Sequence, residues 1–158
     1  MESKLGPSRA SRVDLARLFS DLVRLETELW DRVDGRLRED HDLPLSWFEP
    51  MQLMDRVADC RVVDIAEALS ITEGGVSKLV DRIERAGWCV RAPNPNDARS
   101  FVVSLTRAGR RVLKAATDSC DDELTLGLGV ALSPERLASF ASTVRDLRRH
   151  IADHRSAR

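Results

Sequence analysis

Apolar residues recur at intervals of three and four through the first quarter of the chain, a spacing that predicts one long amphipathic helix. The helix is expected to begin near Ser11 and to run for about 28 residues, or roughly 40 Å. Its apolar positions are Leu15, Leu18, Phe19, Leu22, Leu25, Leu29, Val33 and Leu37. A helix this long in a chain of 158 residues is typical of one that packs against a partner subunit.

Shorter helical patterns follow. A turn over residues 40–45 contains Pro44, after which Ser46 is expected to cap a second helix. Two short helices come next, with apolar residues at i, i+3, i+4 and i+7. These positions are Val62, Ile65, Ala66 and Leu69, then Val76, Leu79, Val80 and Ile83. Thr72 is a natural N-cap of the second of them, and Gly87 suits the position after its end. Two short helices joined by a short turn predict a helix-turn-helix.

After Gly87 the pattern changes from helical to β-prone. Residues 88–91 and 101–105 form two short β-prone runs, separated by a loop rich in Pro and Asn over residues 92–97. Two strands around a loop, directly after a helix-turn-helix, predict a wing.

Two further helices complete the chain. Thr106 is expected to cap one that runs from Arg107 to about Leu126, and a Gly-rich break follows. Ser133, then Pro134 and Glu135, is a typical start for the last helix. The predicted fold class is mainly α with a small β-wing, that is, a winged helix-turn-helix with long N- and C-terminal dimerisation helices. The expected organisation is a flexible N-terminal tail over residues 1–10, a dimerisation region over 11–45 and 107–158, and a winged helix-turn-helix lobe over 46–106.

Composition excludes several other classes of protein. The chain is 42% hydrophobic and 32% charged, as soluble globular proteins are. The N-terminus lacks the apolar stretch of a signal peptide, and no apolar run is long enough to span a membrane. Cys60, Cys89 and Cys120 have no CxxC spacing, so a zinc ribbon or thioredoxin-like motif is excluded. Unpaired thiols fit a reducing compartment, and a cytoplasmic location is expected.

The net charge of −1 hides an uneven distribution. Residues 1–60 carry a charge of −4, whereas residues 71–114 carry +5, with 9 basic and 4 acidic side chains. The basic segment covers the second helix of the helix-turn-helix, the wing and the start of the next helix. Because phosphate affinity depends on local Lys and Arg rather than on net charge, we interpret this segment as a DNA-binding surface rather than as an ordinary solvated face.

Several motifs in order resemble MarR-family transcriptional regulators. They are Asp64 to Leu69, Thr72 to Gly87, Asp97-Ala98-Arg99-Ser100 at the wing, and Leu105 to Gly109 after it. The resemblance implies a homodimer held by the terminal helices, which places recognition helices and wings on an inverted repeat of double-stranded DNA. Many members are repressors released by a small aromatic or anionic ligand or by cysteine oxidation. One departure is that the helix starting near Val63 lacks the usual Ser or Thr cap, so its start is expected to fray or to differ.

The expected DNA-binding residues combine this resemblance with position. Ser77 and Lys78 lie near the start of the recognition helix, the part that usually reaches base edges, and Arg82 and Arg85 are better placed for phosphates. In the wing, Arg99 is expected in the minor groove, whereas Asp97 is expected to brace the turn. The full recognition-helix set is Thr72, Gly74, Gly75, Ser77, Lys78, Arg82 and Arg85. The glycines also allow a plainer interpretation, a poorly formed first turn.

Regulatory sites are less clearly marked. An effector pocket could involve Trp30, Trp47, Phe48, Met51 and Met54, but plain core packing is the favoured interpretation of such residues. None of the cysteines lies in the first helix, where the peroxide-sensing branch carries its reactive thiol, so inert buried thiols are favoured. His150 and His154 are spaced i, i+4, but a solvated pair is favoured over a metal site, and no cofactor is expected.

Two other classes of function compete with a DNA-binding regulator. An enzyme is disfavoured because the sequence contains no P-loop, GxGxxG, GxSxG or HExxH motif. A winged-helix interaction module without specific DNA binding predicts a recognition helix that is not basic, whereas this one carries Lys78, Arg82 and Arg85. The sequence identifies neither an effector, nor an operator, nor the sign of regulation.

Overall fold

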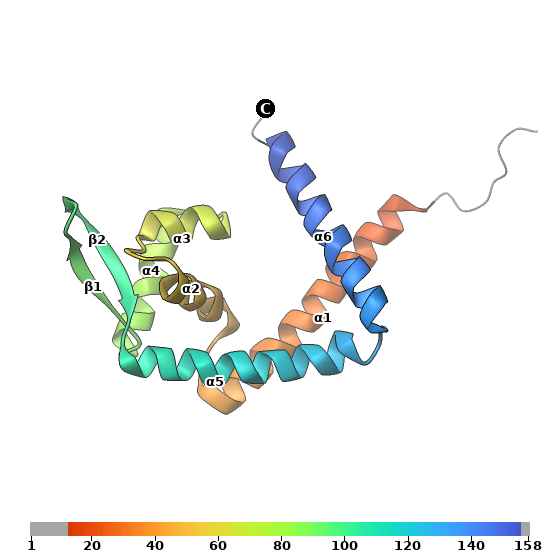
Figure 1. Cartoon of the computed structure of the whole chain (residues 1–158), viewed down its shortest axis with the longest axis horizontal. Helices are drawn as coiled ribbons and strands as arrows, with labels where there is room; N and C mark the ends of the chain where they lie inside the picture. Colours follow the sequence, from red (N-terminus) through yellow and green to blue (C-terminus); the bar gives the residue numbers. More distant parts are fainter. Residues whose placement is uncertain (1–12, 156–158) are drawn as a thin grey trace, which may run out of the picture.

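The computed structural model describes residues 13–155 (Figure 1). The tail expected over residues 1–10, and the expected helix start at Ser11, lie outside this range. The elements are α1 (Leu15–His41), α2 (Leu45–Arg56), α3 (Val62–Leu69), α4 (Glu73–Arg85), β1 (Cys89–Asn94), β2 (Asp97–Leu105), α5 (Arg107–Leu124), the π-helix η1 (Thr125–Gly129) and α6 (Pro134–Arg155). This order confirms the predicted fold class, mainly α with a small β-wing.

The elements form a lobe with long helices beside it. Figure 1 shows α2, α3, α4 and the β1–β2 wing together at one end, with α5 running from the base of the wing towards α1 and α6 at the other. The α5 helix packs against both α1 and α2, so it links the lobe to the long helices. The two strands pair antiparallel, and an isolated bridge from Arg61 to Val102 ties the start of α3 to the wing.

The hydrophobic core lies where five helices meet. Leu37 of α1, Met51 of α2, Ile65 of α3, Ile83 of α4 and Ala116 of α5 are all completely buried. The apolar positions in the N-terminal half of α1, by contrast, are mostly exposed. The predicted amphipathic helix therefore uses only its C-terminal half to build the core of its own chain.

The start of α2 differs from the sequence prediction. Ser46 is not its cap, because the helix already begins at Leu45 with Pro44 in the N-cap position. The Leu45 N–H donates instead to Asp34 Oδ1 of α1 at 2.7 Å. Burial alone would raise the pKa of Asp34, but hydrogen bonds from Arg38 and from the Leu45 N–H outweigh it and lower the pKa below its usual value. A carboxylate on another helix thus supplies the cap.

The start of α3 is also held without Ser or Thr. The helix begins at Val62, and the Asp64 carboxylate accepts from the Arg61 N–H at 2.8 Å and from the Arg61 guanidinium. These bonds secure the first turn, so of the two expected outcomes the start of the helix differs from the usual Ser or Thr cap rather than frays. Thr72 caps α4 as predicted, since its hydroxyl oxygen accepts from the Gly75 N–H at 3.2 Å.

The wing and the break before α6 are more regular than predicted. Residues 92–94 belong to β1 and residues 97–100 to β2, so only Pro95 and Asn96 remain between the strands. The pairing of the strands is irregular at one place within the predicted loop, a register shift between Pro93 and Asn94. The predicted Gly-rich break begins inside a π-helix, which continues directly from α5.

Candidate nucleic-acid interface

The α4 helix presents a basic face to solvent. Val76, Val80 and Ile83 are completely buried, and this fixes which side of the helix faces away from the core. The exposed side carries three cations, Lys78, Arg82 and Arg85. None of these three side chains makes a hydrogen bond or ion pair with any of the described residues, so their donors are available to a ligand.

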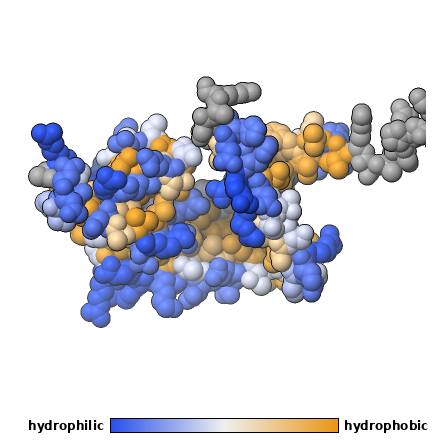
Figure 2. All heavy atoms as spheres, turned by 45° about the horizontal axis from the view of Figure 1, so that its top comes forward, coloured by the Kyte–Doolittle hydropathy of each residue, from blue (hydrophilic) through white to orange (hydrophobic). Residues whose placement is uncertain are grey.

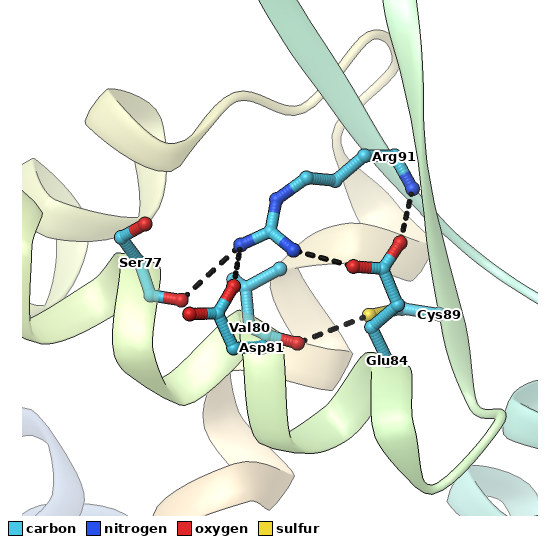
Figure 3. A network of polar contacts seen from close by, with 6 residues as sticks. All are labelled: Ser77, Val80, Asp81, Glu84, Cys89 and Arg91. Carbon is cyan, nitrogen blue, oxygen red and sulfur yellow. Dashed lines mark hydrogen bonds and ion pairs between the residues drawn. The ribbon is translucent and has the colours of Figure 1, made fainter.

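A fourth cation of the basic segment, Arg91 of β1, is used internally (Figure 3). Its Nη2 donates to Asp81 Oδ1 at 2.6 Å and to the Ser77 carbonyl oxygen at 3.2 Å, and its Nη1 donates to Glu84 Oε2 at 2.5 Å. The Arg91 backbone N–H also donates to Glu84 Oε1 at 3.0 Å. The wing is therefore clamped to α4 through one side chain.

The clamp also changes the electrostatics of α4. Burial alone would lower the pKa of Arg91, but its hydrogen bonds to Asp81 and Glu84 outweigh it and raise the pKa above the usual value, so Arg91 stays charged. In return its single positive charge partly offsets the negative charge of Asp81 and Glu84, two α4 carboxylates that would repel a polyanion. Sequence reasoning missed this role, although two acids at i, i+3 on a helix followed by an arginine in the next strand were visible.

The turn of the wing is organised by short polar side chains. The Arg99 N–H donates to Asp97 Oδ1 at 3.0 Å, and the Asn96 N–H donates to Asn94 Oδ1 at 2.9 Å. Asn94 also donates to the Ser100 hydroxyl oxygen at 3.0 Å. The Asp97 carboxylate is therefore used within the turn, where it holds the backbone of Arg99. The Arg99 side chain itself is exposed.

The base of the wing is held to α5 by a close approach. Thr106 caps α5 by accepting from the Gly109 N–H at 3.0 Å, and its hydroxyl donates to the Gly87 carbonyl oxygen at 2.7 Å. Gly109 is buried, and a Cβ there would overlap the Trp88 carbonyl oxygen. Gly87 has φ of 77°, a left-handed conformation that favours glycine. Glycine is therefore required on both sides of this junction.

The first-turn glycines of α4 are in open surroundings. A Cβ at Gly74 would meet nothing within 4 Å, and one at Gly75 would meet only the Thr72 hydroxyl oxygen at 3.2 Å. Packing within the chain therefore does not require either glycine. The first turn is nonetheless helical and capped, in contrast to the plainer interpretation of a poorly formed turn.

The five expected effector residues separate into three groups. Trp30 and Phe48 line an apolar cleft between α1, α2 and α5. Trp47 packs edge-on against Trp88, with ring centroids 5.8 Å apart. Met51 and Met54 are buried in the hydrophobic core. The structure thus brings only two of the five to a common cavity.

The remaining candidate groups offer little chemistry. The three cysteines are free and buried; burial raises the pKa of the Cys60 and Cys89 thiols to about 11 and shifts that of Cys120 in the same direction. The rings of His150 and His154 lie next to each other on α6, with centroids 4.2 Å apart and planes tilted by 42°. Within residues 13–155, no group of three or more His, Cys, Asp or Glu side chains is arranged to hold a metal ion. No helix in the described part of the chain is long and apolar enough to cross a membrane.

Comparison with known proteins points to one family. Residues 51–101 match the model of the MarR family. The multiple antibiotic resistance protein MarR of Escherichia coli is 25% identical over 119 residues, covering 75% of this chain and 83% of that protein. MarR of Salmonella typhimurium is 31% identical over 86 residues, covering 54% of this chain and 60% of that protein.

Solved structures share the fold over nearly the whole chain. A MarR family transcriptional regulator from Streptomyces coelicolor, in complex with DNA, superposes with a TM-score of 0.80 at 22% identity, covering 89% of this chain and 93% of that one. A mutant MarR from E. coli complexed with operator DNA superposes with a TM-score of 0.77 at 20% identity, covering 85% of this chain and 95% of that one.

The fold and the basic helix define a winged-helix protein. Family model, curated relatives and solved structures agree: residues 51–101 match the MarR family, and the chain shares the fold of MarR-family regulators. Members of this family are transcription regulators rather than enzymes.

Proposed function

We propose that this protein is a sequence-specific DNA-binding repressor that acts as a homodimer on an inverted repeat and is released by a small ligand. The observation that carries the proposal is the exposed face of α4, where Lys78, Arg82 and Arg85 have no partner among the described residues. Unpaired cations on a helix that is anchored by its opposite side suit the DNA major groove. The relatives solved with DNA share this fold.

Each candidate residue has a proposed role at the DNA. Ser77 and Lys78 lie in the N-terminal half of α4 and read base edges, with Lys78 donating to guanine. Arg82 and Arg85, further along the helix, contact phosphates. Thr72, which caps the helix, and Gly74 and Gly75, which leave its first turn bare, allow the backbone to approach the DNA.

The wing adds a second contact. Arg99 is exposed at the turn and enters the minor groove, where a narrow A·T tract concentrates negative potential. Asp97 does not contact DNA in this proposal, because its carboxylate is occupied by the Arg99 N–H. Its role is to fix the turn from which Arg99 projects.

Dimerisation is supported by apolar side chains that this chain leaves uncovered. On α1, Leu15, Phe19 and Val23 are exposed, and on α6, Leu147 and Ile151 are exposed. Figure 2 shows hydrophobic atoms along the outer end of α1, at the upper right beside the grey residues. Exposed apolar surface of this extent is typical of an interface. A second copy that covers these helices pairs two lobes on one DNA, as an inverted repeat requires.

The repressor role and the ligand response come from the resemblance to MarR-family regulators. The apolar cleft lined by Trp30 and Phe48 supports a ligand site, because it lies between α1 and α5, outside the α4 face. A ligand there acts on the junction between the lobe and the long helices.

The proposal is tested by fluorescence anisotropy with the DNA upstream of the protein's own coding sequence. We expect the purified protein to sediment as a dimer and to prefer this DNA to a scrambled sequence at two salt concentrations. A dimer with no preference between the two sequences contradicts the proposal. That result favours the alternative, a winged-helix interaction module.

A further inference from the structure

The cleft between α1, α2 and α5 has an apolar interior and an acidic rim. Its volume is about 270 Å³, and its interior includes Leu29, Val33 and Phe48. Trp30, which also lines the cleft and is 42% exposed, adds an aromatic ring that is accessible from solvent. A cavity of this size and polarity accommodates a small aromatic molecule.

Two glutamates define the charge of the cleft. On α1, Glu26 precedes Leu29 and Trp30 by three and four residues, so it lies one turn away on the same face. On α2, Glu49 directly follows Phe48. Both glutamates line the cleft, and no lysine or arginine among the described residues does.

Neither carboxylate is neutralised by a cation. Within residues 13–155, Glu49 has no hydrogen bond or ion pair, and Glu26 receives only a long contact of 3.5 Å from the Thr27 hydroxyl. An anion in the cleft is therefore repelled by two charges that no cation compensates. A cation is attracted by both, and the Trp30 ring offers a further cation–π interaction.

We propose that the cleft binds an aromatic cation, a planar apolar ring system that carries an alkylammonium group. The ring occupies the interior beside Phe48, and the ammonium group lies at the rim between Glu26 and Glu49. This inference rests on the proposed ligand response and narrows it, because it selects cationic over anionic aromatic effectors.

The test is isothermal titration calorimetry of the full-length protein with three ligands of matched shape: 1-naphthylmethylammonium, 1-naphthalenemethanol and 1-naphthylacetate. They differ mainly in charge. We expect the ammonium compound to bind at least about tenfold more tightly than the alcohol, and the carboxylate to bind more weakly than the alcohol. Equal affinities, a preference for the carboxylate, or no binding by the ammonium compound overturns the proposal.

Variants locate the site. The double variant Glu26→Gln/Glu49→Gln is expected to lower the affinity for the ammonium compound to about that of the alcohol while leaving alcohol binding unchanged. Glu28→Gln is the matched control, since Glu28 is exposed on α1 but does not line the cleft, and it is expected to change nothing. An equal loss in the control and the double variant overturns the assignment to this cleft.

The titration contains no DNA, so its result on ligand binding in the cleft is independent of the proposed DNA binding. Operator binding is measured in parallel by anisotropy, with and without the ammonium compound. Ligand binding without operator binding contradicts the proposed function but supports the cleft assignment. Operator binding without ligand binding supports the proposed DNA binding but contradicts the cleft assignment.

Discussion

Arg91 Nη2 lies 2.6 Å from Asp81 Oδ1, and this ion pair joins the wing to the helix proposed to read DNA. The same guanidinium pairs with Glu84, so one cation partly offsets the charge of two carboxylates on α4. Because these carboxylates lie on the same helix as Lys78 and Arg82, the clamp sets both the position of the wing and the charge of the DNA-facing surface.

Removal of the clamp is expected to weaken both the fold and DNA binding. For Arg91→Ala we expect the free energy of unfolding to fall by about 1–2 kcal/mol, since the pairs are partly exposed. Operator affinity is expected to fall about tenfold or more, because two carboxylates are left facing the phosphates. Chemical denaturation and anisotropy measure the two effects.

A second set of substitutions separates charge from position. Adding Asp81→Asn and Glu84→Gln to Arg91→Ala removes the uncompensated charges without rebuilding the clamp. Partial recovery of operator affinity is expected. If the folded Arg91→Ala variant binds DNA as the wild type does, the clamp has no part in recognition.

The wing arginine is expected to contribute affinity without contributing stability. Arg99→Ala removes the proposed minor-groove contact and is expected to cost about 1–3 kcal/mol of operator binding. The melting temperature is expected to remain unchanged, because the turn is held by backbone and Asp97 contacts. Arg136→Ala, at an exposed position on α6, is the control. Unchanged operator affinity in Arg99→Ala would remove the wing from the mechanism.

Two glycines are expected to respond in opposite ways to alanine. Gly109→Ala is expected to destabilise the fold strongly, because its Cβ would overlap the Trp88 carbonyl oxygen. Gly74→Ala is expected to stabilise the fold by up to about 1 kcal/mol, because the helix gains propensity and the new methyl group meets nothing. Thermal unfolding measures both.

Gly74→Ala also tests the proposed approach of the backbone to DNA. We expect the variant to be more stable and yet to bind operator more weakly. A variant that is more stable and binds equally well shows that this glycine has no role at the DNA.

The buried thiols make stability depend on alkaline pH. Because burial raises the pKa of Cys60 and Cys89 from 9.0 to about 11, the folded state holds protons that the unfolded state loses between these values. The unfolded state binds fewer protons there, so the free energy of unfolding falls as the pH rises from 9 to 11. Below pH 9 the contribution is fully present.

Denaturation curves across this pH range check the thiol prediction. Cys60→Ala/Cys89→Ala is expected to flatten the dependence, although it lowers stability at every pH. The same burial predicts slow reaction of the native protein with a thiol reagent at pH 8 and rapid reaction after unfolding. Fast labelling of the native protein would be inconsistent with these raised pKa values.

Local patterns were sufficient to predict the helices and the position of the wing. Thr72 and Thr106 were correctly predicted as caps. Each accepts a hydrogen bond from the N–H three residues later, so a local sequence pattern is sufficient to identify it. The start of α2 was mispredicted because its cap, Asp34, lies 11 residues away on another helix. The wing strands were predicted too short, since pairing across the wing extends them through Pro93 and Asn94.

The basic surface could be predicted only in part from the sequence. The excess of positive charge was located correctly, but Arg91 was counted as one of its members, whereas the structure uses it internally. Which cations remain unpaired depends on tertiary contacts between α4 and β1. The acidic rim of the cleft was missed for the same reason, because Glu26 and Glu49 line one cleft only when α1 packs beside α2.

The unpaired cations of α4 are proposed to bind DNA, and the salt dependence of operator affinity measures this binding directly. Each phosphate contact contributes about 0.9 to the slope of log affinity against log salt. For Arg82→Ala/Arg85→Ala we therefore expect the slope to fall by about 3.6 in a dimer, with preference for operator over scrambled DNA retained. A slope equal to that of the wild-type protein would contradict the claim.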